Sequence, residues 1–261
     1  MSQIHILGSC SGTEPMPGRH HTSWILEHKG RLYMFDAGEG CAWTAVNLGL
    51  DILNIRQIFI SHPHTDHTEG LSHLLVSIVS LMYAHEVKSI PPIELYTPSV
   101  PLVQSIRDYL KHSRTYIDNW YDLQVKQVAD GPVFSDGEIA VEVQHNLHFG
   151  EPAAGEAWCS FSYRIDVGGR KIVYSADVKS IDDLGDWTQD CDWLMMESGH
   201  HNPKEVCETL SRRNARIGHI LWMHHGRLFL SDAWGKLHRE CMEAFPNGEV
   251  LVAHDCRSYE I

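Results

Sequence analysis

The sequence predicts an α/β protein, and two observations carry this prediction. Short apolar or alternating runs, separated by Gly, Pro or Asn, fill the first third of the chain and indicate strands. Beyond Glu69 apolar residues recur at helical spacing, and strand-like and helix-like segments are mixed through the rest of the chain. Elements in this order indicate sheets that are covered by helices.

The expected elements follow in order along the chain. Strands are expected at residues 4–8, 23–28, 31–36 and 55–61, and again at 139–147, 160–165, 171–175, 220–223 and 249–253. Helices are expected from residue 71 over about four turns, at 100–112, from Pro203 to about residue 214, and at 233–244. No short repeat or Ser/Gly-rich linker interrupts them, so we expect one domain over residues 1–261.

The composition limits the class of protein. With 261 residues, 43% of them hydrophobic and 21% charged, the chain can bury a substantial core. The first residues lack the features of a signal peptide, no stretch is long enough to span a bilayer, and the seven cysteines are never spaced as CxxC. We therefore expect a cytoplasmic protein with reduced thiols and no membrane partner. A formal charge of -13 without a Lys/Arg cluster disfavours binding along a nucleic-acid backbone.

Histidine is abundant, with 19 residues, and it is clustered. The stretch 61–70, SHPHTDHTEG, places His62, His64, Asp66 and His67 directly after an apolar strand. At a strand end His62 and His64 can point the same way while Asp66 and His67 turn towards a neighbouring position, so one loop can serve two ions. Imidazole nitrogen and carboxylate oxygen suit zinc, with manganese or iron as alternatives. A polar surface loop with coincidental histidines does not explain this density.

A two-metal site needs further ligands, and His148, Asp177 and His224 each follow a predicted strand. His145 competes with His148, but alternation places His145 on the apolar face of its strand, whereas His148 lies beyond the strand end. His225 competes with His224 for the role of metal ligand, but it should face the other side of the strand end. A strand-end Asp or His taken alone is more often a turn residue, but the order of these residues after the histidine loop favours metal ligands.

The order of these motifs resembles the metallo-β-lactamase superfamily, and specifically its ribonuclease Z-like branch: HxHxDH, a single His, an Asp after a strand ending in YSAD, and a late His. The segments LGSCSGTEPMPGRHHTSWIL and YMFDAGEG also resemble the opening strands and first motif of that branch. The resemblance covers nearly the whole chain. It implies a single hydrolase domain with an αββα four-layer sandwich that contains two mixed β-sheets.

The resemblance further implies a dinuclear centre, which we expect to hold two divalent ions, Zn2+ before Mn2+ or Fe2+. The ligands of one ion would be His62, His64 and His148, those of the other Asp66, His67 and His224, and Asp177 would bridge both. Asp36 would orient the histidine loop without binding metal, or would only end a strand in a turn.

The expected chemistry is hydrolysis. Metal binding lowers the pKa of water from 15.7 to about 7, so a hydroxide that bridges the two ions would attack the substrate. Asp66, Glu197 and His200 are the candidates for handling protons. The segment ESGHH, residues 197–201, resembles a compressed version of the branch's separate Glu and His motifs, and His201 could replace His200.

The leading expectation is a phosphodiesterase that acts on a small or nucleotide-like substrate. The chain lacks an obvious basic, Gly/Pro-rich arm of the kind that long-form tRNA 3′-processing enzymes use to hold tRNA. A tRNA 3′-processing endoribonuclease is therefore the second expectation, with RNA left open but disfavoured by the charge. A thioester or lactone hydrolase and a non-catalytic metal-binding module are further alternatives, because a fold does not choose among them. The sequence leaves open whether the protein forms a homodimer.

Overall fold

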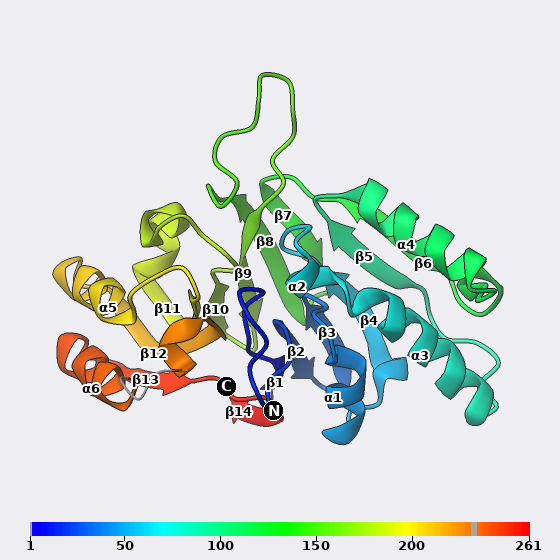
Figure 1. The fold of residues 1–261 in the computed structure, drawn as a ribbon, viewed down its shortest axis with the longest axis horizontal. Coiled ribbons are helices and arrows are strands. Elements are labelled where there is room, and N and C mark those ends of the chain that lie inside the picture. The colour runs from blue at the N-terminus through cyan, green and yellow to red at the C-terminus, as the bar shows by residue number, and fades with distance from the viewer. Residues whose placement is uncertain (1, 231–233) are drawn as a thin grey trace. The chain divides into compact units, whose positions relative to one another are not determined.

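A computed structural model describes residues 2–230 and 234–261. The chain divides into two compact units. Unit 1 comprises Met1–Gly8, Gly18–Val128 and Asp255–Ile261, and unit 2 comprises Ser9–Pro17 and Ala129–His254. Each unit is built on a mixed seven-stranded sheet (Figure 1), so the predicted α/β class with two mixed sheets is confirmed. One domain over residues 1–261 stays a prediction.

The sheet of unit 1 has the strand order β14-β1-β2-β3-β4-β5-β6. Neighbouring strands are antiparallel from β14 to β3 and parallel from β3 to β6. The strands are β1 (Ser2–Gly8), β2 (Ser23–His28), β3 (Arg31–Phe35), β4 (Ile55–Phe59), β5 (Ile93–Thr97), β6 (Leu123–Gln127) and β14 (Arg257–Glu260).

Helices connect the parallel strands of unit 1, because such strands need crossover connections. They are α1 (Cys41–Asn47), α2 (Thr65–Thr68), α3 (Leu71–Ala84) and α4 (Val100–His112), with short 3₁₀ turns η1 (Ile52–Asn54) and η2 (Ile117–Asn119). Figure 1 shows α1, α3 and α4 on the same side of these strands. The periodicity predicted for α3 is confirmed, since its buried residues are Leu71, Leu74, Leu75, Ile78 and Met82. This face joins the core of unit 1 and fixes the helix that follows the histidine loop.

The sheet of unit 2 has the strand order β13-β12-β11-β10-β9-β8-β7. Its strands are antiparallel from β7 to β10 and parallel from β10 to β13. The strands are β7 (Gly131–Ser135), β8 (Ile139–His145), β9 (Phe161–Val167), β10 (Arg170–Tyr174), β11 (Asp190–Ser198), β12 (Arg216–His225) and β13 (Glu249–Val252).

Two helices, α5 (Pro203–Arg212) and α6 (Trp234–Ala244), pack with the parallel strands of unit 2 in one apolar core. The 3₁₀ segments are η3 (Ile181–Thr188) and η4 (Arg227–Leu230). Residues 146–160 connect β8 to β9 without regular structure, and Figure 1 shows this connection projecting from its strands. His148 lies at the start of the projecting connection.

Several elements differ from the sequence-based expectations. The strand expected at 55–61 ends at Phe59, and the strand expected at 139–147 ends at His145, so the residues that follow are free to turn. The elements α1, α2, β5, β6, β7, β11 and β14 were not predicted. Ala233, part of the expected last helix, lies outside the described residues. Among the described helices, none combines the length and the apolar character needed to cross a membrane.

Candidate metal centre

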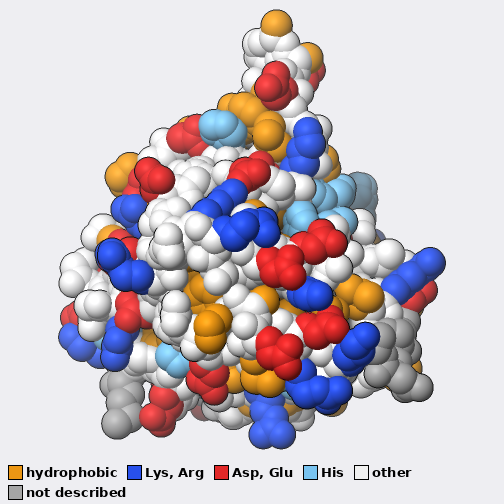
Figure 2. Space-filling view, turned by 90° about the vertical axis from the view of Figure 1, so that its left-hand side faces the viewer, with side chains coloured by type: hydrophobic (Ala, Val, Ile, Leu, Met, Phe, Trp, Pro, Cys, Tyr) orange, Lys and Arg blue, Asp and Glu red, His pale blue; other side chains and the backbone are white. Residues whose placement is uncertain are grey.

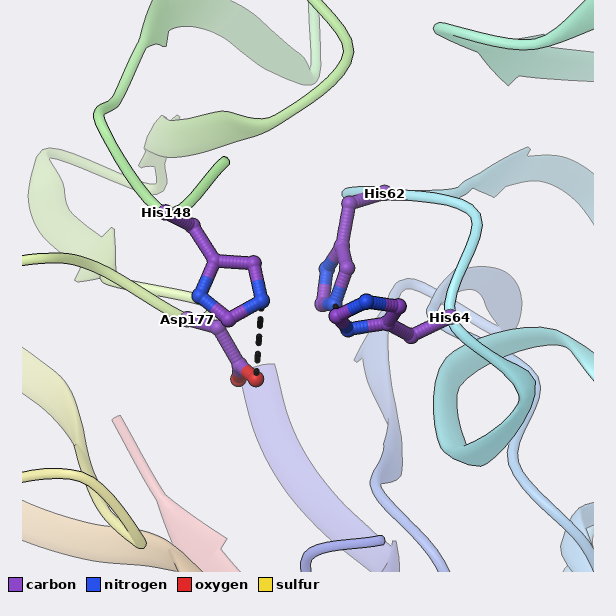
Figure 3. Close-up of side chains that lie close together, drawn as sticks. All are labelled: His62, His64, His148 and Asp177. Atoms are coloured by element: carbon purple, nitrogen blue, oxygen red, sulfur yellow. Dashed lines mark hydrogen bonds and ion pairs between the residues drawn. The ribbon is translucent and has the colours of Figure 1, made fainter. Parts of the chain in front are cut away.

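The histidine loop of unit 1 leaves the carboxyl end of β4 and enters α2. His62 and His67 are completely buried, Asp66 is buried, and His64 is exposed. His64 is the N-cap of α2, and the Thr68 hydroxyl donates a hydrogen bond of 2.9 Å to its carbonyl. The Nε2 atom of His62 lies 3.1 Å from Nδ1 of His64 (Figure 3), and Nε2 of His67 lies 3.6 Å from a carboxylate oxygen of Asp66. The loop thus presents two pairs of donor side chains.

Asp36 holds the histidine loop in place through hydrogen bonds. Its carboxylate accepts hydrogen bonds from the Ser61 amide at 2.7 Å, from the Ser61 hydroxyl at 2.9 Å and from Nδ1 of His67 at 2.8 Å. Because Nδ1 of His67 donates to Asp36, Nε2 is the ring nitrogen left to bind a ligand. Asp36 has a φ of 56°, a left-handed conformation that Asp tolerates better than most residues.

Two glycines let the backbone on either side of the loop come close together. The amide of Ala37 donates to the His67 carbonyl at 2.8 Å, and the Gly70 amide donates to the Ala37 carbonyl at 2.9 Å. A Cβ atom at Gly70 would lie 2.1 Å from the Gly38 carbonyl oxygen, and one at Gly38 would lie 2.6 Å from the Asp66 carbonyl oxygen. Only glycine fits either position, so these glycines set the position of the ligand loop.

In unit 2, Asp177 follows β10 and is buried beside two histidines. One of its carboxylate oxygens lies 3.2 Å from Nε2 of His224 and 3.9 Å from Nε2 of His148, the pair joined by the dashed line in Figure 3. His224, the second-last residue of β12, has a φ of 53° and is buried. Unit 2 therefore gathers one carboxylate and two imidazoles from three separate strand ends.

Glu197 forms a second cluster in unit 2. Its buried carboxylate lies 3.0 Å from Nδ1 of His200, 3.2 Å from Nε2 of His201 and 3.8 Å from Nδ1 of His224. Burial alone would raise the pKa of Glu197, but hydrogen bonds from these three histidines outweigh it and hold the pKa well below its ordinary value. The bond from Glu197 raises the pKa of His200. The cluster is thus an ionised carboxylate that orients two imidazoles.

The competing histidines occupy other positions. Nδ1 of His145 lies 2.6 Å from Asp130, and its ring stacks on Trp158 with centroids 3.9 Å apart. His225 is buried, with Nδ1 3.0 Å from the Ser198 hydroxyl and Nε2 2.9 Å from the Ala253 carbonyl. Both rings take part in packing and hydrogen bonding within unit 2.

Sequence reasoning missed the groups that support these side chains. Ser61 gives Asp36 two of its hydrogen bonds, and the Ser175 hydroxyl accepts one of 3.0 Å from the Glu197 amide. The backbone of His225 is held by Ser9 and Ser11, through bonds of 2.7 and 3.0 Å. A serine beside a ligand was the only signal available for Ser61, and nothing in the sequence connects residues 9–11 to residue 225.

The amino-acid sequence is similar to those of several curated proteins. The ribonuclease Z of Treponema denticola is 36% identical over 142 residues, which are 53% of this chain and 42% of that protein. The ribonuclease Z of Bacillus subtilis is 24% identical over 97% of both chains. The chain spans less than half the length of the first curated relatives that it matches.

Solved structures extend the same comparison. The short form of human tRNase Z superposes with a TM-score of 0.74 at 20% identity over 99% of both chains. The metallo-β-lactamase fold protein YhfI of Bacillus subtilis gives 0.76 at 15% identity over 100% of this chain and 99% of that one. The chain therefore has the metallo-β-lactamase fold of these structures. It belongs to the family described as Anti-Pycsar protein Apyc1, whose model matches residues 2–226.

Proposed function

We propose that this protein is a two-metal phosphodiesterase that acts on a small, nucleotide-like substrate. One ion would be held by His62, His64 and His148 and the other by Asp66, His67 and His224, and Asp177 would be a ligand of both. The observation that carries the proposal is the presence in each unit of preassembled donors. In unit 1 the donor atoms of His62 and His64 lie within 4.8 Å of each other, and so do those of Asp66 and His67. In unit 2 a donor atom of Asp177 lies within 4.8 Å of one of His148, and the same holds for Asp177 and His224.

The donor set fits divalent ions of the zinc type. Imidazole and carboxylate are the ligands that zinc accepts, and manganese and iron share them. His67 also donates its second ring nitrogen to Asp36, as metal-binding histidines commonly do with a carboxylate. When bound, a pair of such ions supplies Lewis acidity and an activated water near neutral pH.

Glu197 and His200 are suited to protonate the leaving group. Nδ1 of His200 is bound by Glu197, so Nε2 is the ring atom that can deliver a proton to a departing oxygen. The raised pKa of His200 keeps more of its ring protonated near neutral pH than an ordinary histidine would be. The His200 side chain is 47% exposed, which lets it reach a substrate. Asp66 serves as a ligand and as an acceptor for the proton of the attacking water.

A small substrate suits the charge of the chain better than a polynucleotide. The formal charge is -13, and the electrostatic attraction on which nucleic-acid binding depends requires basic surface. The curated relatives named ribonuclease Z nevertheless favour a second candidate, tRNA 3′ processing. The two candidates share the metal centre and differ in substrate.

The proposal is tested by metal content and hydrolysis. Purified protein with zinc or manganese should hydrolyse bis-p-nitrophenyl phosphate and 3′,5′-cyclic nucleoside monophosphates, and His64→Ala and Asp177→Ala should lose both bound metal and activity. His200→Ala should keep its metal and lose about 100-fold in kcat for the cyclic nucleotides, whose leaving group needs a proton. It should lose much less for bis-p-nitrophenyl phosphate, whose leaving group departs as a stable anion. A fully loaded protein that cleaves neither substrate would overturn the proposal.

The same preparation distinguishes the second candidate. Precursor tRNA should stay uncut even at low salt, where electrostatic attraction between protein and RNA is strongest. Cleavage at the 3′ side of the tRNA, lost in Asp177→Ala, would instead establish tRNA processing and refute the preference for a small substrate.

A further inference from the structure

A cavity of about 480 Å³ lies in unit 2 beside the Glu197 cluster. One wall is the turn that joins β11 to α5, and the other comes from η4 and α6. The lining residues are Gly199, His200, His201, Asn202, Leu228, Lys236, Leu237 and Glu240. Figure 2, which looks onto the side of unit 2 that carries α5 and α6, shows histidine side chains gathered at the surface with acidic and basic side chains around them. The volume falls within the range of small-molecule sites.

His200 connects the cavity to the proposed reaction centre. This residue lines the cavity, and its ring also lies 5.4 Å from the rings of His148 and His224. A substrate whose leaving oxygen faces His200 would therefore place the rest of its leaving group in or beside the cavity. The cavity is thus placed to hold a part of the substrate that does not react.

Some polar side chains of the cavity lining are already engaged in hydrogen bonds within the protein, whereas others can contact a ligand. The Asn202 side chain caps α5, accepting from the Lys204 amide at 3.1 Å and donating to Glu205 at 3.3 Å. His201 is held by Glu197 and by the Val178 carbonyl at 3.0 Å. These groups build the wall and have no obvious capacity for a ligand.

Lys236 and Glu240 are the pair that can recognise a ligand. They lie one turn apart on α6 with Nζ and a carboxylate oxygen 3.6 Å apart, and the Lys236 side chain is 75% exposed. An exposed pair of this kind contributes little to stability, so turning it towards a ligand costs little. Together the pair offers a donor and an acceptor next to each other, beside the apolar side chains of Leu228 and Leu237.

We propose that this cavity binds the heterocyclic base of a nucleotide substrate, a proposal that rests on the function proposed above. The faces of a base are apolar and suit Leu228 and Leu237. Its edge carries neighbouring acceptors and donors: Lys236 donates to a ring nitrogen or carbonyl, and Glu240 accepts from an amino or imino group. Lys236 and Glu240 are thus the specificity-determining residues of the subsite.

The first test compares substrates with and without a base. In Lys236→Met, the ratio of kcat/KM for the best 3′,5′-cyclic nucleotide to that for bis-p-nitrophenyl phosphate should fall about tenfold, mainly through KM, because a hydrogen bond from a charged group is lost. Glu240→Gln should change the preference among the four bases. Lys204→Met is the matched control, because Lys204 forms the same type of pair with Glu208 at 3.9 Å on α5, outside the cavity lining. An unchanged ratio in Lys236→Met would overturn the proposal.

The second test separates this proposal from the proposed function. Isothermal titration with adenosine, guanosine, cytidine, uridine and inorganic phosphate needs no hydrolysis. Nucleoside binding that weakens about tenfold in Lys236→Met and not in Lys204→Met would support the subsite even if no phosphodiester were cleaved. If Lys236→Met instead weakens binding of phosphate and leaves nucleoside binding intact, the cavity holds a phosphate and the base assignment is refuted. If all substrates are hydrolysed, and wild type and Lys236→Met bind nucleosides with equal affinity, the subsite is refuted and the proposed function stands.

Discussion

Asp36 shows how one buried side chain positions several others. The resemblance to a known superfamily implied that Asp36 orients the histidine loop, with a turn at the end of a strand as the alternative. The structure adds the partners: Ser61 gives two hydrogen bonds and His67 gives one. No spacing rule connects residue 36 to residue 61, so the role of Ser61 could not be predicted. It depends on β3 and β4 lying next to each other.

Replacing Asp36 by Ala should destabilise the metal-free protein by about 3 kcal/mol. The change removes the acceptor of three buried hydrogen bonds, two from Ser61 and one from His67, and it places Ala in the left-handed conformation that Asp36 adopts. Urea unfolding followed by circular dichroism measures the effect. Asp36→Asn is the control, because Asn keeps the shape, one acceptor oxygen and the tolerance of that conformation, and it should lose less. Equal stability of Asp36→Ala and wild type would show that these hydrogen bonds do not hold the loop.

At the level of elements, periodicity decided what could be predicted. Helix α3 was found because its apolar residues repeat along one face, and β2 because it is bounded by turn residues. Strand β11 was missed because it is buried on both faces through most of its length, and so it shows no alternation. Strand β14 was missed because its four residues are polar or exposed, and only its pairing with β1 makes it a strand.

The neighbouring strands β5 and β6 are joined by a charged pair whose contribution depends on pH. Glu94 binds Lys126, and it also accepts hydrogen bonds of 3.1 Å from Gln57 and Tyr96. Burial would raise the pKa of Glu94, but these hydrogen bonds outweigh it and lower the pKa, while the bond to Glu94 raises the pKa of Lys126. The Glu94 contribution is therefore fully present above its unfolded pKa of about 4.3 and is lost as the pH falls through the lowered folded value.

Glu94→Gln should accordingly cost about 0.5 to 1 kcal/mol at pH 7, a small value because Lys126 is 42% exposed. The difference from wild type should shrink towards zero below about pH 4, where the unfolded carboxyl is protonated and the folded one begins to be. Urea unfolding at pH 7, 5 and 3 measures it. Glu243→Gln changes an exposed glutamate of α6 and should show no such dependence. A difference that persists undiminished at pH 3 would contradict the assignment.

For the molecule as a whole, the sequence offered candidate metal ligands more readily than the groups that support them. The histidine loop was a candidate because its donors are adjacent in sequence, and His148, Asp177 and His224 were selected as polar residues at strand ends. The two mixed sheets followed only from the resemblance to a known superfamily. The lining of the base subsite could not be predicted, because it requires α6 to pack beside the turn after β11. The complete ligand set stays a prediction.

Metal removal tests that prediction on the intact protein. If the proposed ions take ligands that are far apart in the sequence, they bind the folded chain and not the unfolded one, and excess metal stabilises the folded state by about 4 kcal/mol at a thousandfold excess over Kd. Chelation should then lower Tm by about 10 °C in differential scanning calorimetry. The variant His64→Ala should show a smaller shift. A Tm that is the same with zinc and with chelator would contradict a tightly bound centre.

The order of the strands also bears on how the protein is made. Strand β1 begins at Ser2 and pairs with β14, which ends at Glu260, and residues 9–11 pair with the end of β12. During translation the first segment of the chain can pair early with β2, but it must wait for more than two hundred later residues before its hydrogen bonds to β12 and β14 can form. Both sheets are completed only when β13 and β14 have been synthesised, so the unfinished chain carries exposed strand edges until then.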